Sequence, residues 1–182
     1  FPTRRSSDLE TEAVDESQTT ETENKITLDA SGNAAAGDQS TENKTAEPST
    51  LDELFGGENL SVTYTGAEIA ANYMEGGYYS LDAEQGKTFV IVGIDITNSG
   101  ADEIAIDNFA KTPKFSVMVN GQEKAEEENT ILPSDFALYQ ETVPAGVTEN
   151  TILLFQVPDS VTSVDSLDLF VNISGTNYQI TL

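Results

Sequence analysis

The chain has 182 residues, with 32 acidic against 8 basic side chains and a formal net charge of −24. It contains no Cys, His or Trp, which excludes disulfides, thiolate or imidazole metal ligands, and catalysis by a Cys nucleophile or a His base. The negative charge argues against nucleic acid and anionic membrane surfaces as partners, because phosphate binding needs clustered Lys or Arg. No run approaches the roughly 18 consecutive apolar residues that cross a bilayer.

The first nine residues, FPTRRSSDL, do not begin with Met and match the translated end of a common short-read sequencing adapter. The match covers all nine positions. We therefore expect residues 1–9 to be an artefact rather than a basic patch or the remnant of a targeting sequence, and we exclude them from reasoning on fold and function. The natural N-terminus is then expected to be missing from the chain.

Residues 10–49 are dominated by Glu, Thr, Ser, Asn and Ala, and they contain no aromatic side chain. Such a segment buries too little apolar surface to offset the entropy lost on ordering, and its like charges favour extension. The composition predicts a disordered acidic linker. An acidic interaction tail is the alternative.

A short helical turn is expected at residues 50–58. Thr50 and Glu53 have the spacing of a capping box, residues 51–55 place apolar side chains at helical intervals, and Gly56-Gly57 ends the turn. This turn would attach the linker to the domain, although a short motif for a partner is an alternative reading.

Residues 59–182 alternate apolar and polar side chains in short runs separated by turn signals, with no long helical period. The run 88–98 is almost continuously β-forming, as in a central strand buried on both faces, and Asn120-Gly121 is a hairpin signal. The expected strands are 60–65, 88–98, 104–106, 115–119, 136–139, 151–157, 167–173 and 178–182. The pattern predicts an all-β fold, an antiparallel β-sandwich of two sheets around one core.

Three motifs of this region resemble a known family. They are GKTFVIV at 86–92, continuing through DITN at 95–98, then Pro144-Ala145-Gly146, and FQVP at 155–158. In this order they are similar to the immunoglobulin-like domain of uncharacterised secreted lipoproteins of Gram-positive bacteria. That family is a domain of unknown function, similar in fold to a secreted mycobacterial antigen. The resemblance covers roughly residues 59–182.

The resemblance implies an immunoglobulin-like sandwich and a location outside the cell. In this family a signal peptide, a lipidated Cys and a polar linker precede the domain, so we expect an extracellular, membrane-anchored protein whose anchor is missing from this chain. Residues 10–49 would be the linker. The family supplies no catalytic residues and no cofactor, and the Tyr-rich stretch at 73–79 departs from its pattern.

Acidic side chains are abundant, so catalysis by a pair of carboxylates has to be considered. It needs two carboxylates facing each other across a cleft, one of them with a raised pKa. The candidates lie in expected turns, where solvated carboxylates are ordinary. They are Asp82, Glu84, Asp102, Glu103, Asp107, Glu126, Glu127, Glu128, Asp165 and Asp168. A Ser-His-Asp triad is impossible without His, although Ser–Lys pairs stay open. We expect no enzyme and no cofactor.

Calcium would suit this composition best among metals, because it takes carboxylate, amide and carbonyl oxygens. Two groups of residues are candidates: Asp102-Glu103 with Asp107-Asn108, and Asp159 with Asp165 and Asp168. Neither has the spacing of an EF-hand loop, and a solubilising acidic surface explains both. We predict no metal site.

The most distinctive feature is NYMEGGYY at residues 72–79, in which three Tyr and one Met surround a Gly pair. Tyr offers rigid amphipathic contact area and can stack on sugars, so this stretch suits a recognition loop. We predict Tyr73, Glu75, Tyr78 and Tyr79 as ligand contacts. The structural alternative is that Tyr79 begins an edge strand and that Tyr73 covers the end of the core.

Together these expectations describe a non-catalytic extracellular domain that binds an envelope protein or a glycan. A passive spacer in a larger cell-surface protein is the alternative, and a carboxylate-dependent hydrolase is a third reading.

Overall fold

The computed structural model describes residues 47–122 and 124–182 of the protein. The expected artefact at 1–9 and all but the last three residues of the expected linker at 10–49 therefore lie outside the described residues. The elements in chain order are β1 (Glu47–Pro48), α1 (Leu51–Phe55), β2 (Leu60–Ala70), β3 (Asn72–Glu75), β4 (Tyr79–Asp82), β5 (Lys87–Asn98), β6 (Ile104–Ala105), η1 (Phe109–Lys111), β7 (Lys114–Val119), β8 (Ala125–Glu126), β9 (Thr142–Val143), β10 (Thr148–Pro158), β11 (Leu167–Ile173) and β12 (Thr176–Thr181).

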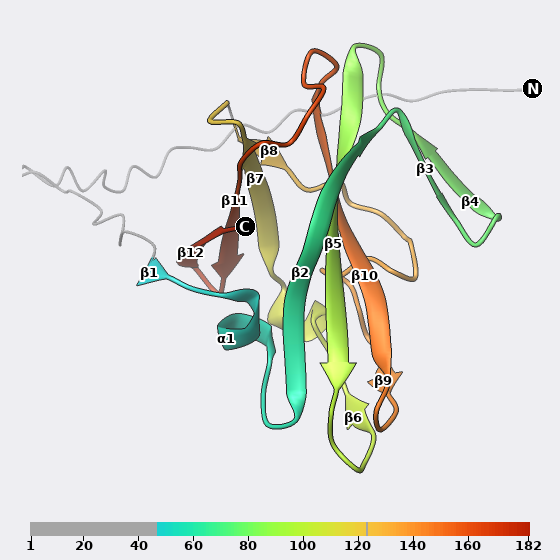
Figure 1. Cartoon of the computed structure of the whole chain (residues 1–182), viewed down its shortest axis with the longest axis vertical. Helices are drawn as coiled ribbons and strands as arrows, with labels where there is room; N and C mark the ends of the chain where they lie inside the picture. The colour runs from blue at the N-terminus through green and yellow to red at the C-terminus, as the bar shows by residue number, and fades with distance from the viewer. Residues whose placement is uncertain (1–46, 123) are drawn as a thin grey trace, which may run out of the picture. The chain divides into compact units, whose positions relative to one another are not determined.

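Two sheets pack against each other around one main core (Figure 1). The smaller has the order β10-β5-β2 and the larger has the order β1-β12-β11-β7-β8. Within the described residues, the strands of both sheets pair antiparallel except for β1, which runs parallel to β12. The prediction of an all-β antiparallel sandwich is confirmed.

Strand β5 is central in its sheet and buries side chains on both faces, as its sequence predicts. The side chains of its even-numbered residues point into the main core: Val90, Val92, Ile94 and Ile96. On the outer face, Phe89 and Ile91 of β5 belong to a second apolar cluster. Leu132 and Leu154 complete this cluster. The opposing sheet fills the main core with alternate residues of β7 and β11: Phe115, Val117, Val119, Leu167, Leu169 and Val171. A strand alternates sides with every residue, so period-two sequence produces this layered core.

The short helix α1 belongs to the core. Its capping box is present, with Thr50 Oγ1 accepting from the Glu53 amide at 3.1 Å and Glu53 Oε2 accepting from the Thr50 amide at 2.9 Å. Leu51 and Phe55 are buried in the main core. Asp52 Oδ1 accepts a hydrogen bond from the Val62 amide at 2.9 Å, which satisfies a backbone donor on the free edge of β2.

The larger sheet also includes the end of the expected linker. Residues 47 and 48 pair with Tyr178 and Gln179 of β12, and the Ser49 amide donates to the Gln179 carbonyl at 3.2 Å. Both the beginning of the described chain and its end therefore lie at the same sheet edge (Figure 1).

Two of the expected turns are present. Asn120 and Gly121 both have positive φ, 52° and 70°, and the Gln122 amide closes the turn on the Val119 carbonyl at 3.0 Å. The returning strand β8 begins only at Ala125. The C-terminal hairpin of β11 and β12 is formed as predicted.

The strand predicted at residues 136–139 is wrong. Phe136 and Tyr139 are buried, but they begin and end a turn rather than a strand. This turn starts at the last residue of a segment, residues 127–136, that we call the crossing segment. It leaves β7 at Glu127, whose amide donates to the Phe115 carbonyl at 3.1 Å, and then follows β10. Bonds from the Glu128 amide to Leu154 and from the Phe136 amide to Ile152, each 2.8 Å long, cover the free edge of β10. The prediction of a strand rested on the apolar side chains of residues 136–139 alone. In the structure, the backbone that pairs with the edge of β10 comes from the preceding residues 128–136.

Candidate functional site

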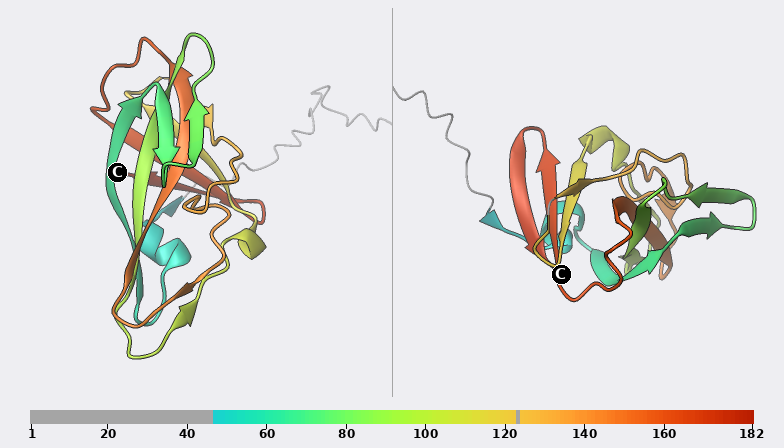
Figure 2. Two further views of the ribbon diagram at one scale, coloured as in Figure 1. Left: turned by 90° about the vertical axis from the view of Figure 1, so that its right-hand side faces the viewer. Right: turned by 90° about the horizontal axis from the view of Figure 1, so that it is seen from above.

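The Tyr-rich stretch is a hairpin rather than a loop. Strands β3 and β4 pair antiparallel, and Gly76 and Gly77 turn the chain with φ of 58° and 75°, a region that glycine enters without strain. The Tyr78 amide donates to the Glu75 carbonyl at 3.1 Å within this turn. The hairpin projects from the side of the smaller sheet (Figures 1 and 2).

The two faces of the hairpin have different environments. Tyr73 pairs with Leu81 and Glu75 pairs with Tyr79, so these four side chains share the face that turns toward the sandwich. Tyr73 and Leu81 pack on the second apolar cluster. Met74 belongs to the opposite face and is 65% exposed.

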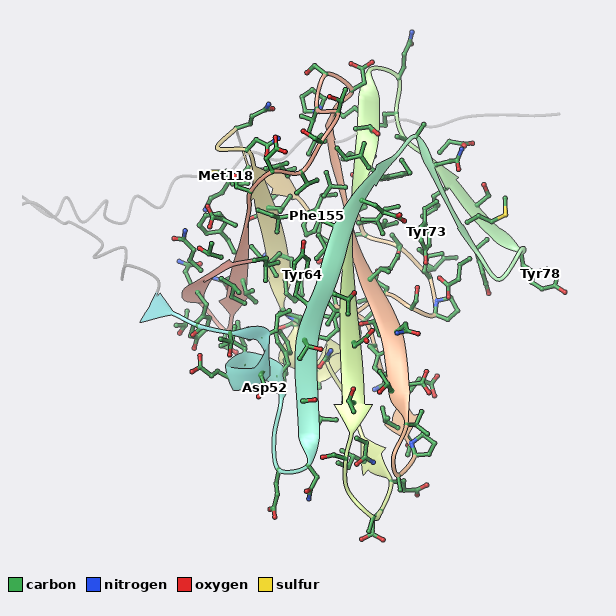
Figure 3. The ribbon with its side chains drawn as sticks, in the orientation of Figure 1. Asp52, Tyr64, Tyr73, Tyr78, Met118 and Phe155 are labelled. Atoms are coloured by element: carbon green, nitrogen blue, oxygen red, sulfur yellow. The ribbon has the colours of Figure 1, made fainter. Side chains whose placement is uncertain are left out.

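The three predicted tyrosines therefore have different roles in the structure. Tyr78, at the tip, is 93% exposed and points away from the domain, and Tyr79 is 43% exposed (Figure 3). Tyr73 is half-buried between the hairpin and the smaller sheet. Of the three, Tyr78 and Tyr79 offer open ring surface. The structural alternative also applies in part, because Tyr79 begins strand β4 and Tyr73 packs on the second apolar cluster. Ligand contact by these residues and Glu75 stays a prediction.

The hairpin is joined to the crossing segment by polar contacts. Ser134 Oγ donates to Glu75 Oε2 at 2.7 Å and lies 3.4 Å from the Tyr73 hydroxyl oxygen. The apolar cluster holds Tyr73 and Leu81, and Ser134 holds Glu75 next to the turn. The tip is therefore presented from a fixed support.

Beside the hairpin lies a hollow of about 320 Å³, which we call the acidic hollow. Its lining residues are Glu75, Pro133, Ser134, Tyr139, Glu141, Thr142, Glu149 and Asn150. Three of these are carboxylates and none is basic. Burial, followed by the negative charges of Glu149 and Glu141, raises the pKa of Tyr139. The local potential is therefore negative at the wall of the hollow.

A carboxyl pair that the sequence did not reveal lies in the crossing segment. Asp135 is 4% exposed and accepts hydrogen bonds from the Thr130 hydroxyl and, at 3.0 Å, from the Ala137 amide. Burial raises the pKa of Asp135, and these hydrogen bonds lower it. Burial, the Asp135 charge and a hydrogen bond to Asp135 together raise the pKa of Glu127 to about 9. Because Asp135 accepts from two donors, Glu127 is the member that holds the proton at neutral pH.

This pair shares a proton as catalytic carboxylate pairs do, but its position in the fold does not suit catalysis. Glu127 borders a hollow of about 220 Å³, whereas Asp135 is 4% exposed and does not line that hollow. A general acid and a base must both reach the substrate, and Asp135 does not. Glu127 was among the acidic candidates, but Asp135 was missed. Its one sequence signal is an acid placed directly before the apolar run at 136–139.

The other acidic candidates are dispersed. No group of three or more Asp or Glu within the described ranges could hold a metal ion. Several of these carboxylates form local hydrogen bonds. Asp107 Oδ1 accepts from the Ala110 amide at 2.9 Å, Asp165 accepts from Ser163 at 3.0 Å, and Asp168 accepts from Thr181 at 2.8 Å.

Comparison with known proteins gives fold-level likeness only. No family model matches the chain, and no curated protein matches it. An uncharacterized beta-sandwich protein from Clostridium difficile is similar with a TM-score of 0.44 and 18% identity, over 69% of this chain and 87% of that chain. The yjhA protein from Bacillus subtilis gives 0.38 and 15%, over 68% and 92%. A candidate lipoprotein from the same organism gives 0.35 and 12%, over 68% and 36%.

Identities of this size do not carry a function from one chain to another. Within residues 47–122 and 124–182, no helix is long and apolar enough to cross a membrane.

Proposed function

We propose that this protein is a non-catalytic binding domain whose contact surface is the tip of the β3–β4 hairpin. The observation that carries the proposal is the exposure of Tyr78, at 93%, on a hairpin whose base is packed into the second apolar cluster. Tyr79 adds exposed ring surface on the face that turns toward the sandwich, and Met74 adds exposed apolar surface on the opposite face.

Exposed aromatic side chains on a fixed support suit recognition. A Tyr ring buries a large area at little conformational cost, and contact energy concentrates in such side chains. Tyr73 and Leu81 hold the hairpin by packing, so binding at the tip would not first have to order a loop. The proposed contacts are Tyr78 and Tyr79, with Glu75 as a polar neighbour and Tyr73 as support.

We further propose that the domain is part of a membrane-anchored protein and lies outside the cell. Its partner would be an envelope protein or a glycan, and it would need no cofactor. The support is the acidic, aromatic-free composition of residues 10–49 together with the motif resemblance of residues 59–182.

Sedimentation of the full chain with envelope fragments from a Gram-positive bacterium tests the proposal. The fragments are used both intact and after protease treatment. The double variant Tyr78→Ala/Tyr79→Ala should lose most of the co-sedimentation with an unchanged melting temperature, because both rings are exposed. Phe109→Ala is the matched control, since Phe109 is also an exposed ring, 56% exposed, but lies on η1. Equal sedimentation of wild type and the double variant would refute the proposal, and a spacer domain would then explain the protein better.

A further inference from the structure

Charge is unevenly distributed around the hairpin. Residues 66–86 include the hairpin, and residues 127–158 include the crossing segment and β10. Neither range contains a Lys or Arg. The lysines of the described residues are Lys87, Lys111, Lys114 and Lys124, and they lie on or next to β5, η1, β7 and β8. A ligand approaching the hairpin tip therefore meets exposed rings beside a surface of one charge sign.

The acidic hollow lies directly against the proposed contact surface. Glu75 contributes to both, because it lines the hollow and shares its hairpin face with Tyr79. Glu141 and Glu149 face it from the flank of β9 and from β10. Ser134 and Asn150 use their donors within the protein, to Glu75 at 2.7 Å and to Asp95 at 2.6 Å. The hollow therefore presents three carboxylates and two hydroxyls, those of Tyr139 and Thr142, and its lining contains no cationic side chain.

We propose that the partner is a basic polypeptide segment, which places an apolar side chain on Tyr78 and Tyr79 and an adjacent Lys or Arg in the acidic hollow. This inference rests on the proposed function and names the partner class for the same surface. The hollow's volume, about 320 Å³, is at the lower end of the range for small-ligand pockets and is ample for one long cationic side chain.

Charge complementarity selects a polypeptide over the other partner classes. An anionic glycan or a phosphate-bearing polymer would be repelled by Glu75, Glu141 and Glu149. A neutral glycan would stack on the rings but would not use the negative potential that also raises the pKa of Tyr139. A Lys or Arg side chain gains from both features, because its stem packs on an aromatic ring while its charge meets carboxylates.

Binding of the full chain to labelled peptides by fluorescence anisotropy tests the inference. The probe is an octapeptide that alternates lysine with leucine, and its counterpart has glutamine in place of every lysine. Chitotetraose, a neutral amino-sugar tetramer, is the glycan probe. The test variant is Glu141→Gln/Glu149→Gln. The matched control is Asp159→Asn/Asp165→Asn, which makes the same change in net charge beyond the other end of β10.

The inference expects the lysine peptide to bind and the glutamine peptide to bind much more weakly. Each carboxylate near a partly exposed cation contributes modestly, so neutralising two in the hollow should weaken binding about fivefold, against less than about twofold for the control. Tyr78→Ala/Tyr79→Ala should weaken binding as well. Higher salt should reduce the affinity of wild type more than that of the hollow variant.

Three results would overturn the inference. One is an equal loss in the hollow and control variants, because the attraction would then come from net charge alone. Another is absence of lysine-peptide binding at about 1 mM. The third is tyrosine-dependent binding of chitotetraose that does not respond to the hollow variant. That result would leave the proposed function intact with a glycan as ligand, so it separates a failure of the inference from a failure of the proposed function.

Discussion

The Phe55 ring packs edge-on against the Phe136 ring, with centroids 4.9 Å apart and planes at 73°. Phe55 comes from α1 and Phe136 is the last residue of the crossing segment, so two segments outside the main strands meet in the core. Phe115 of β7 lies 5.9 Å from both rings. The helix is thereby part of the sandwich.

This contact predicts that the domain needs residues before 59. Phe55→Ala should lower the free energy of unfolding by about 3–5 kcal/mol, the usual cost of removing a buried Phe ring. A chain beginning at residue 59 should fare worse, because it also loses Leu51 and the Asp52 bond to Val62. Urea unfolding followed by tyrosine fluorescence measures both. Leu54→Ala on the same helix, where the side chain is only partly buried, is the control and should cost less. Unchanged stability of the truncated chain would mean that the domain does not need α1.

The Glu127–Asp135 pair predicts an unusual pH dependence. The folded pKa of Glu127 is raised to about 9 from an ordinary value of 4.5, so between these values the folded state holds a proton that the unfolded state releases. Its contribution to stability is complete below about pH 4.5 and is lost as pH rises toward 9. Glu127→Gln keeps a hydrogen-bond donor and cannot ionise. It should therefore be more stable than wild type above about pH 5, by a margin that grows by up to ~1.4 kcal/mol per pH unit.

Thermal unfolding of wild type and Glu127→Gln from pH 4.5 to 9 measures this margin. Glu126→Gln is the matched control, because Glu126 is an exposed neighbour. Its melting temperature should stay a constant interval from that of wild type. Parallel curves for wild type and Glu127→Gln would contradict the proton assignment.

Asn120 predicts a stability effect that can be separated into side-chain and backbone parts. Its side chain donates to the Ser163 carbonyl at 2.9 Å and accepts from the Asp165 and Ser166 amides at 2.8 and 3.1 Å, which joins the turn after β7 to the segment before β11. Asn120→Gly keeps the positive φ and loses these bonds, at a cost of about 1–3 kcal/mol. Asn120→Ala adds the strain of that φ and should cost more. Equal melting temperatures of Asn120→Gly and wild type would contradict the role of the side chain.

Net charge predicts stabilisation by salt. Residues 59–182 contain 18 acidic side chains against 4 lysines, a net charge of −14, and the described residues contain a single ion pair, Lys87 with Glu84 at 3.7 Å. Repulsion therefore exceeds attraction, and screening should reduce it. Raising sodium chloride from about 10 to about 150 mM, where the Debye length falls from roughly 30 to 8 Å, should raise the melting temperature by a few degrees. A flat or falling melting temperature would count against repulsion.

The candidate site was only partly predictable. The sequence singled out residues 72–79 because Tyr, Met and Gly are concentrated there, and the structure places Tyr78 at the exposed tip. The sequence did not distinguish the half-buried Tyr73 from the exposed Tyr78, because that difference depends on which side of the hairpin packs against the domain. The acidic hollow was not foreseen, because Glu75, Glu141 and Glu149 come from three separate segments.

Local patterns by themselves determined the main strands of this protein. Period-two alternation in residues 88–98 and 167–182, the Asn120-Gly121 turn and the capping box at Thr50 each depend on neighbours along the chain, so their physics is legible in the sequence. Tertiary structure alone decided the rest. Residues 127–136 lie along the edge of β10 because unpaired backbone groups of that strand are available there. The raised pKa of Glu127 follows because this path buries Glu127 and brings it beside Asp135. Burial and charge act through space, and no pattern along the chain records which distant groups the fold will bring together.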